Sequence, residues 1–201
     1  MKLSVQDLSC VRGGRLVFDG LSLDLLGGAG VKLTGPNGSG KSSLLRVLAG
    51  FIPPAGGSIR LEGGEHEASL GEQCHYVGHL NGVKRALSVQ ENLAFWAEYL
   101  GGKDVDKALK AFDLENLAHI PAGMLSAGQA RRLGLARLAL VYRPLWLLDE
   151  PSVSLDAGSQ KILSHAVTAH IKAGGMVIAA THTPLGVKFA QTLKLDAGGR
   201  Q

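Results

Sequence analysis

Residues 35 to 42 have the glycine, lysine and serine spacing of a loop that binds phosphate groups. The pattern G-x-x-x-x-G-K-S is completed by Gly35, Gly40, Lys41 and Ser42, between the apolar run VKLT and the helix-like segment LLRVLAGF. Backbone N–H groups and a helix N-terminus can hold β- and γ-phosphates, while Lys41 adds a positive charge and Ser42 can ligate Mg²⁺. We therefore expect a nucleotide to be held by Gly35, Pro36, Asn37, Gly38, Ser39, Gly40, Lys41, Ser42 and Ser43.

Two adjacent carboxylates follow an apolar run much later in the chain. The segment LWLLDEP indicates a buried parallel strand that ends in Asp149 and Glu150. Asp149 can hold Mg²⁺ through water, and Glu150 can orient a water molecule that attacks a phosphate. The alternative is an acidic turn after a strand, but the phosphate loop elsewhere in the chain favours the two chemical roles.

The segment LSAGQ, residues 125 to 129, is a second candidate anion site. Ser126 and Gln129 have the spacing of a capping box at the start of a helix. The Ser126 hydroxyl, the Gly128 N–H group and the helix dipole can also hold a phosphate, separately from the phosphate loop. The pattern leaves open whether this segment is only a helix cap or also receives the phosphate of a partner.

One thiol and two imidazoles lie within six positions of each other in the stretch CHYVGH, as Cys74, His75 and His79. Side chains alternate along a strand, so Cys74 and His75 should point to opposite faces, which makes a metal cluster unfavourable. The second cysteine of the chain is Cys10, and two cysteines are too few for a disulfide framework. We interpret both as reduced thiols.

The elements that position these residues alternate between apolar strands and helices, which indicates an α/β fold with a largely parallel core. The segment SIRLEG is interpreted as a strand in a hairpin with what precedes it. Ser88 and Glu91 predict a capping box that starts a helix through NLAFWAEYL. We expect one domain over residues 1–201, with a small helical subdomain over about residues 83–140.

Three aromatic residues of that subdomain, Phe95, Trp96 and Tyr99, either form its core or meet a partner, and the core interpretation is favoured. The 201 residues, of which 45% are hydrophobic and 19% charged, are enough to bury one substantial core. The start of the chain has no secretory pattern, and the longest apolar stretch is interrupted by charged residues, so we expect neither export nor a membrane span. A net charge of +4 is compatible with polyphosphates, nucleic acid or an anionic membrane and does not choose among them.

The set and order of these motifs resemble those of ABC transporter ATP-binding subunits. The resemblance implies a P-loop NTPase fold, the ABC ATPase cassette, with a mostly parallel core sheet, an antiparallel β edge and a helical subdomain. It implies ATP with Mg²⁺, and a homodimer of cassettes in which the signature segment of each chain caps the γ-phosphate held by the other. The residues matching that segment are Ser126, Ala127, Gly128 and Gln129.

The resemblance also suggests roles for three single residues. Glu150 would polarise the attacking water, and His182, after the apolar run MVIAAT, would be the switch histidine that reaches the γ-phosphate. Asp156 closes PSVSLD, which matches the D-loop.

Two positions depart from the pattern of the family. Arg12 lies where an aromatic residue usually stacks on adenine, although a guanidinium can also stack on a base. His79 lies where a glutamine usually touches Mg²⁺ and the lytic water, in a loop that contacts the membrane subunit. His79 either substitutes for that glutamine or the role is lost.

Within the family, His79, the variant Ala127 and the sequence THTP make the chain similar to ATP-binding subunits of the haem exporter of cytochrome c maturation. This similarity implies integral membrane subunits as partners, a peripheral location on the cytoplasmic side of the inner membrane, and no nucleic acid. Two alternatives stay open: the ATPase subunit of an exporter for another substrate, and a non-transport ABC ATPase that acts on DNA or ribosomes.

Overall fold

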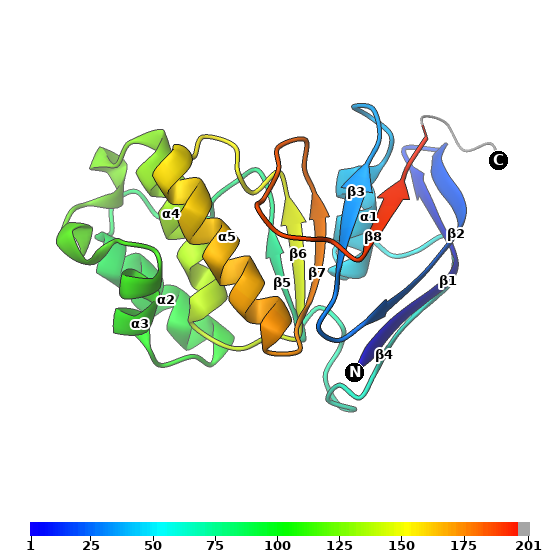
Figure 1. Ribbon diagram of the computed structural model, residues 1–201, viewed down its shortest axis with the longest axis horizontal. Coiled ribbons are helices and arrows are strands. Elements are labelled where there is room, and N and C mark those ends of the chain that lie inside the picture. Colours follow the sequence, from blue (N-terminus) through cyan, green and yellow to red (C-terminus); the bar gives the residue numbers. More distant parts are fainter. Residues whose placement is uncertain (197–201) are drawn as a thin grey trace.

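The computed structural model of the protein describes residues 1–196, which form two β-sheets and five α-helices (Figure 1). The five-stranded parallel sheet has the order β5-β6-β7-β3-β8, and the three-stranded antiparallel sheet has the order β2-β1-β4. The strands are β1 (Lys2–Arg12), β2 (Arg15–Leu26), β3 (Gly30–Thr34), β4 (Gly56–Glu62), β5 (Cys74–Val77), β6 (Leu145–Asp149), β7 (Met176–Ala180) and β8 (Gln191–Lys194). The α-helices are α1 (Lys41–Leu48), α2 (Val89–Leu100), α3 (Val105–Ala111), α4 (Ala127–Ala136) and α5 (Ala157–Lys172).

Strand β6 separates two apolar cores, because successive side chains of a strand point to opposite faces. Leu145 and Leu147 pack with the leucines of α1 and the inner face of the antiparallel sheet. Trp146 and Leu148 pack on the other side, with residues of α2, α4 and α5. The parallel sheet is therefore covered on both faces, which explains why β6 and β7 are apolar without interruption.

The predicted start of α2 is confirmed. The Glu91 N–H group donates to Ser88 Oγ at 3.2 Å, and the Ser88 N–H group donates to Glu91 Oε2 at 2.7 Å, which is the reciprocal pair of a capping box. The helix ends at Gly101, which has the left-handed φ of 77°. Helices α2, α3 and α4 lie together on the side of the parallel sheet that faces away from the antiparallel sheet (Figure 1).

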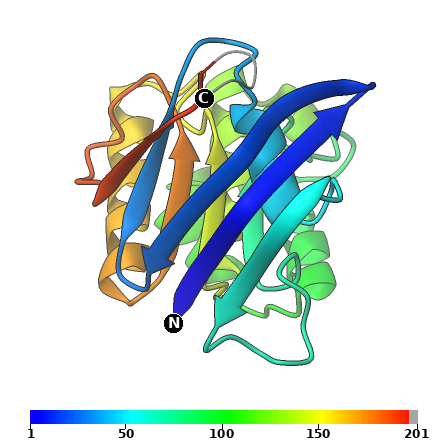
Figure 2. The same ribbon diagram turned by 90° about the vertical axis from the view of Figure 1, so that its right-hand side faces the viewer.

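The hairpin predicted for SIRLEG is wrong. Strand β4 pairs antiparallel with β1, for example Val5 with Ile59, because the segment before β4 is occupied by α1 and a turn. The antiparallel strands form a separate sheet that covers α1, rather than an edge of the core sheet (Figure 2). The predicted α/β class with a largely parallel core sheet is confirmed.

Candidate functional site

The phosphate loop joins β3 to α1 and depends on glycine at two positions. Gly35 has φ of 139°, and a Cβ atom there would lie 2.1 Å from the Leu195 carbonyl oxygen. Gly40 has φ of 98°, and its Cβ atom would lie 2.7 Å from Val17 Cγ1. The positive φ angles and the close approaches leave no room for a side chain at either position. Glycine is therefore required for the loop to fold tightly at the start of α1.

Lys41 folds back over this loop. Its Nζ atom donates to the Gly35 carbonyl at 2.8 Å and to the Pro36 carbonyl at 2.9 Å, and the side chain is buried. Gly40 supplies no side-chain cap to α1, so the free N–H groups of the first helical turn remain available to an anion. The ammonium and these N–H groups make the loop a positive site for phosphate oxygens.

Most of the predicted phosphate-loop residues lie together with Arg12, His79, Asp149 and Glu150 around one cleft of about 790 Å³. Strand ends and loops from both sheets form it, so the antiparallel sheet supplies one wall and the carboxyl edge of the parallel sheet supplies the other. The lining residues are Arg12, Gly13, Val17, Asn37, Gly38, Gly40, Lys41, Ser42, Ser43, His79, Asp149 and Glu150. Of these, Gly13 and Val17 are not predicted from the sequence, although the turn VRGG beside Arg12 is a signal for them.

Asp149, at the end of β6, is suited to a cation. Its side chain is only 2% exposed, and within residues 1–196 its Oδ2 atom has no hydrogen-bond partner. The nearest cationic candidate is His79, whose Nε2 atom lies 3.9 Å from that oxygen. Ser42 lines the same cleft, so a carboxylate and a hydroxyl, both oxygen donors of the kind that Mg²⁺ prefers, share it. The residues present therefore fit Mg²⁺.

Glu150 and His182 lie together because their strands, β6 and β7, are neighbours. His182 Nε2 is 3.5 Å from Glu150 Oε1, and the His182 N–H group donates to Glu150 Oε2 at 3.4 Å. Glu150 has the left-handed φ of 46°, which is uncommon for a residue with a side chain and occurs more often at functional sites. Glu150 lines the cleft with its carboxylate partly exposed, and His182 lies beside it without lining the cleft within the described residues.

The signature segment lies at the start of α4 and does form a helix cap. Ser126 Oγ accepts the Gln129 N–H group at 3.2 Å, and Gln129 Oε1 accepts the Ser126 N–H group at 2.9 Å. The N–H groups of Ala127 and Gly128, in the first turn, have no intrahelical acceptor and stay available. Within the described chain, residues 126–129 do not line the cleft, so the structure does not bring this segment to the phosphate loop of its own chain.

Asp156 is likewise away from the cleft and caps α5. It accepts the Ser159 N–H group at 2.7 Å, and this hydrogen bond lowers the pKa of Asp156 below its usual value.

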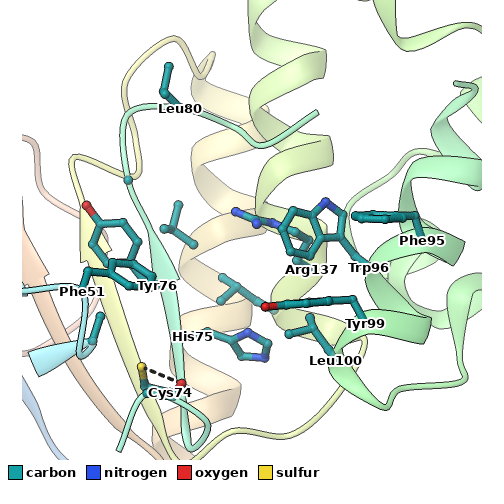
Figure 3. Close-up of a pocket in the computed structure, with 15 residues that line it drawn as sticks. Phe51, Cys74, His75, Tyr76, Leu80, Phe95, Trp96, Tyr99, Leu100 and Arg137 are labelled. Carbon is teal, nitrogen blue, oxygen red and sulfur yellow. Dashed lines mark hydrogen bonds between the residues drawn. The ribbon is translucent and has the colours of Figure 1, made fainter. Parts of the chain in front are cut away.

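A second hollow, of about 370 Å³, lies between β5 and α2 (Figure 3). Phe51 and Tyr76 line one side of it and Trp96 and Tyr99 the other. The core interpretation of the α2 aromatics is wrong for Phe95 and Tyr99, which are 39% and 73% exposed, because they lie on the face of α2 that leaves the core. We call this hollow the aromatic groove.

Cys74 and His75 lie below the aromatic groove on opposite faces of β5. Cys74 packs into the core around α1, and burial raises the pKa of its thiol to about 12. His75 lies against Trp146 with Nε2 3.0 Å from the Val141 carbonyl oxygen, and burial lowers its pKa to about 4. A neutral buried imidazole and a protonated thiol are structural groups here.

Arg131, on α4, is the most extensively hydrogen-bonded side chain near the cleft, and its role is not predicted from the sequence. Its guanidinium is buried and lies behind Asp149 and Glu150. The available signal was a pair of adjacent arginines, Arg131 and Arg132, just after the signature segment, since one of them must lie close to the buried face of the helix.

None of the helices among residues 1–196 has the length and apolar character needed to cross a lipid bilayer.

Comparison with known proteins agrees with this site. The ABC transporter family profile matches residues 18–153. The chain is 53% identical, over 93% of its length and 94% of the other, to the cytochrome c biogenesis ATP-binding export protein CcmA of Nitrobacter winogradskyi. It is 51% identical to the protein of the same name from Rhodopseudomonas palustris strain BisB5, over 98% of this chain and 99% of that one.

The fold comparison agrees as well. A solved structure from Pyrococcus furiosus, described as an ABC transporter ATP-binding protein, superposes with a TM-score of 0.82 at 25% identity, over 97% of this chain and 98% of that one. The phosphate loop, the two carboxylates and the signature helix lie on an ABC ATPase fold. The chain therefore belongs to the ABC transporter family, as one of its ATP-binding, ATP-hydrolysing proteins.

Proposed function

We propose that this protein is the ATP-hydrolysing subunit of an export complex of cytochrome c biogenesis, and that the complex is the haem exporter. The observation that carries the ATPase part is the convergence of Lys41, Asp149 and Glu150 on one cleft. The similarity to CcmA proteins over nearly the whole chain supports the export part. ATP hydrolysis would then drive release of haem-loaded chaperone on the periplasmic side.

Each residue of the cleft has a proposed role. The loop from Gly35 to Ser43 holds the triphosphate, with Lys41 neutralising charge on the β- and γ-phosphates. Ser42 and Asp149 would hold Mg²⁺, the latter through water, and the ion would supply charge neutralisation at the phosphates. Arg12, on the opposite wall, would stack on the base.

Glu150 is proposed as the base that polarises the attacking water. Its carboxylate accepts from the His182 backbone and lies beside the His182 imidazole, which would keep both groups aligned. His182 would in turn reach the γ-phosphate. General-base catalysis by one carboxylate commonly contributes about 10²- to 10⁴-fold to the rate.

A closed homodimer is proposed as the active form. The signature segment, Ser126 to Gln129, has free N–H groups but does not line the cleft of its own chain. Two copies arranged head to tail would place the first turn of α4 of one copy against the γ-phosphate on the other, with Asp156 near the junction. The segment of about residues 83–140 would be a helical subdomain that moves when the pair closes.

The aromatic groove is the proposed docking surface for an apolar segment of an integral membrane subunit. Exposed aromatic side chains line it, and Leu80, 89% exposed, lies next to His79 at its upper edge (Figure 3). His79 would therefore lie between this partner and the Mg²⁺ site, where it would replace the usual glutamine. The protein would be peripheral on the cytoplasmic side of the inner membrane.

Affinity purification from solubilised membranes tests the complex, and gene deletion tests its cargo. We expect integral membrane subunits to co-purify, and c-type cytochromes to be absent from the deletion strain while the polypeptides are still made. An exporter for another substrate would still co-purify with membrane subunits but would leave cytochrome maturation intact. Recovery with ribosomes or nucleic acid, and not with membranes, would contradict the transport function.

A further inference from the structure

Arg131 is a cation buried between the loop that follows β5, residues 78–81, and the backbone of the proposed catalytic residue Glu150. It lies in the second turn of α4, and only 4% of its surface is exposed. Its three nitrogens make five hydrogen bonds, all to oxygen atoms of two segments that are far away in the sequence. The acceptors are the carbonyls of Gly78, Asp149, Glu150 and Pro151 and the side chain of Asn81.

One set of these bonds holds the loop that follows β5. Arg131 Nη1 donates to the Gly78 carbonyl at 2.7 Å and to Asn81 Oδ1 at 3.0 Å. Helix α4 also packs closely on this loop, since a Cβ atom on Gly134 would lie 2.9 Å from Asn81 Cβ. Residues 78–81 include His79 and border the aromatic groove, so the guanidinium fixes the loop from beneath.

The other set holds three successive carbonyls at the end of β6. Arg131 Nε donates to Pro151 at 3.2 Å, and Nη2 donates to Glu150 at 2.8 Å and to Asp149 at 3.4 Å. Glu150 has the left-handed φ of 46°, an unfavourable conformation for a residue with a side chain, which persists only when its surroundings enforce it. The Arg131 bond to its carbonyl and the Ala180 bond to its N–H group, at 2.8 Å, provide that enforcement.

We propose that Arg131 is a positioning residue for hydrolysis, which ties the loop 78–81 to the backbone of Glu150. A guanidinium is planar and rigid, so one side chain can hold both segments at a fixed separation. A shift of the loop, or of α4 with the signature segment at its start, would move the Glu150 peptide. The inference rests on the proposed role of Glu150 as the base.

The neighbouring Arg132 provides a matched control. Its Nη1 atom donates to the Asp113 carboxylate at 3.0 Å and to the carbonyls of Phe112 and Asp113, all within the helical segment that contains α3 and α4. Arg132→Gln therefore removes an arginine from the same turn of the same helix without touching either segment held by Arg131.

The test compares Arg131→Lys, Arg131→Gln and Arg132→Gln in the full-length chain. We expect both Arg131 variants to lose about 10- to 100-fold in kcat, since a small misplacement of a catalytic group has this cost. ATP affinity by titration should change by less than about twofold, because Arg131 does not line the cleft within the described residues. Lysine keeps the positive charge and can satisfy part of the acceptor set, so Arg131→Lys should fold even where Arg131→Gln is unstable.

A double-variant cycle with Asn81→Ala separates positioning from general stabilisation. Asn81→Ala should lower kcat in the wild-type chain, have little further effect in the Arg131→Lys chain, and add fully to Arg132→Gln. The inference is overturned if the Arg131 variants lose no more kcat than Arg132→Gln, or if Asn81→Ala is additive with Arg131→Lys.

Including Glu150→Gln in the series distinguishes the role of Glu150 as the base from the positioning role of Arg131. Wild-type turnover in Glu150→Gln would refute the assignment of Glu150 as the base. If Glu150→Gln is inactive but the Arg131 variants match Arg132→Gln, Glu150 keeps its assignment and only the positioning role of Arg131 is refuted.

Discussion

Replacing Glu150 by glutamine removes a base and preserves its surroundings. Glutamine keeps an oxygen that can accept the His182 N–H group, now accepted by Glu150 Oε2 at 3.4 Å, and it has nearly the same volume. The left-handed turn is held through the backbone, by Arg131 and Ala180, and does not depend on the carboxylate. We therefore expect Glu150→Gln to fold normally and to bind ATP with unchanged affinity.

Turnover should fall sharply in this variant. Loss of a general base commonly costs about 10²- to 10⁴-fold, which equals roughly 3 to 5 kcal/mol of activation free energy. Phosphate release under multiple-turnover conditions measures the rate, and ATP titration measures the affinity.

Glu115→Gln, an exposed change in the 3₁₀ turn Glu115–Leu117, serves as the control and should retain the wild-type rate. Hydrolysis by Glu150→Gln within about threefold of the control would refute the assignment of the base. Loss of ATP binding together with turnover would show that Glu150 acts in nucleotide binding instead.

Three further outcomes follow from the contacts described. Lys41→Ala should weaken ATP binding by about 10- to 100-fold in a titration, because a charge-assisted hydrogen bond contributes about 1.5–3 kcal/mol; unchanged affinity would contradict a phosphate contact. Burial lowers the pKa values of His75 and His170 from 6.5 to about 4. Between these two pH values the unfolded chain binds protons that the folded chain does not. The free energy of unfolding should therefore fall as the pH drops from 6.5 towards 4, by up to about 3 kcal/mol per histidine. Urea unfolding at pH 7.5 and 5 measures this, and His75→Phe should reduce the pH dependence. His79→Ala should lower the ATPase activity stimulated by the membrane subunits more than His79→Gln does; equal, unchanged stimulation in both variants would exclude a coupling role.

The local chemistry of the site was predictable because it depends on short sequence patterns. The phosphate loop, the carboxylates after β6 and both capping boxes are each encoded within eight residues, and all lie where the sequence indicates. The pairing of β4 with β1 was not predictable, since it joins strands separated by a helix, and strand propensity does not choose between such partners.

Exposure of the α2 aromatics was missed for a related reason. Spacing shows which side chains share a helical face, but it does not show whether another element covers that face. Phe95 and Tyr99 are 39% and 73% exposed, and their contacts with other aromatic rings are with Trp96 on the same helix. Arg131 was missed because four of its five acceptors are backbone carbonyls, and carbonyls carry no sequence signal.

We propose that each ATP is enclosed by the phosphate loop of one chain and the signature segment of another. The mass of Glu150→Gln in solution, measured by light scattering with saturating ATP, tests it most directly. We predict a mass that doubles from 21.0 kDa with ATP and not with ADP. Adding Ser126→Arg should prevent the doubling without preventing ATP binding, while Ser88→Arg, which removes the equivalent cap of α2, should leave it unchanged. A mass that stays at 21.0 kDa with ATP bound, or a doubling that survives Ser126→Arg, would contradict the shared site.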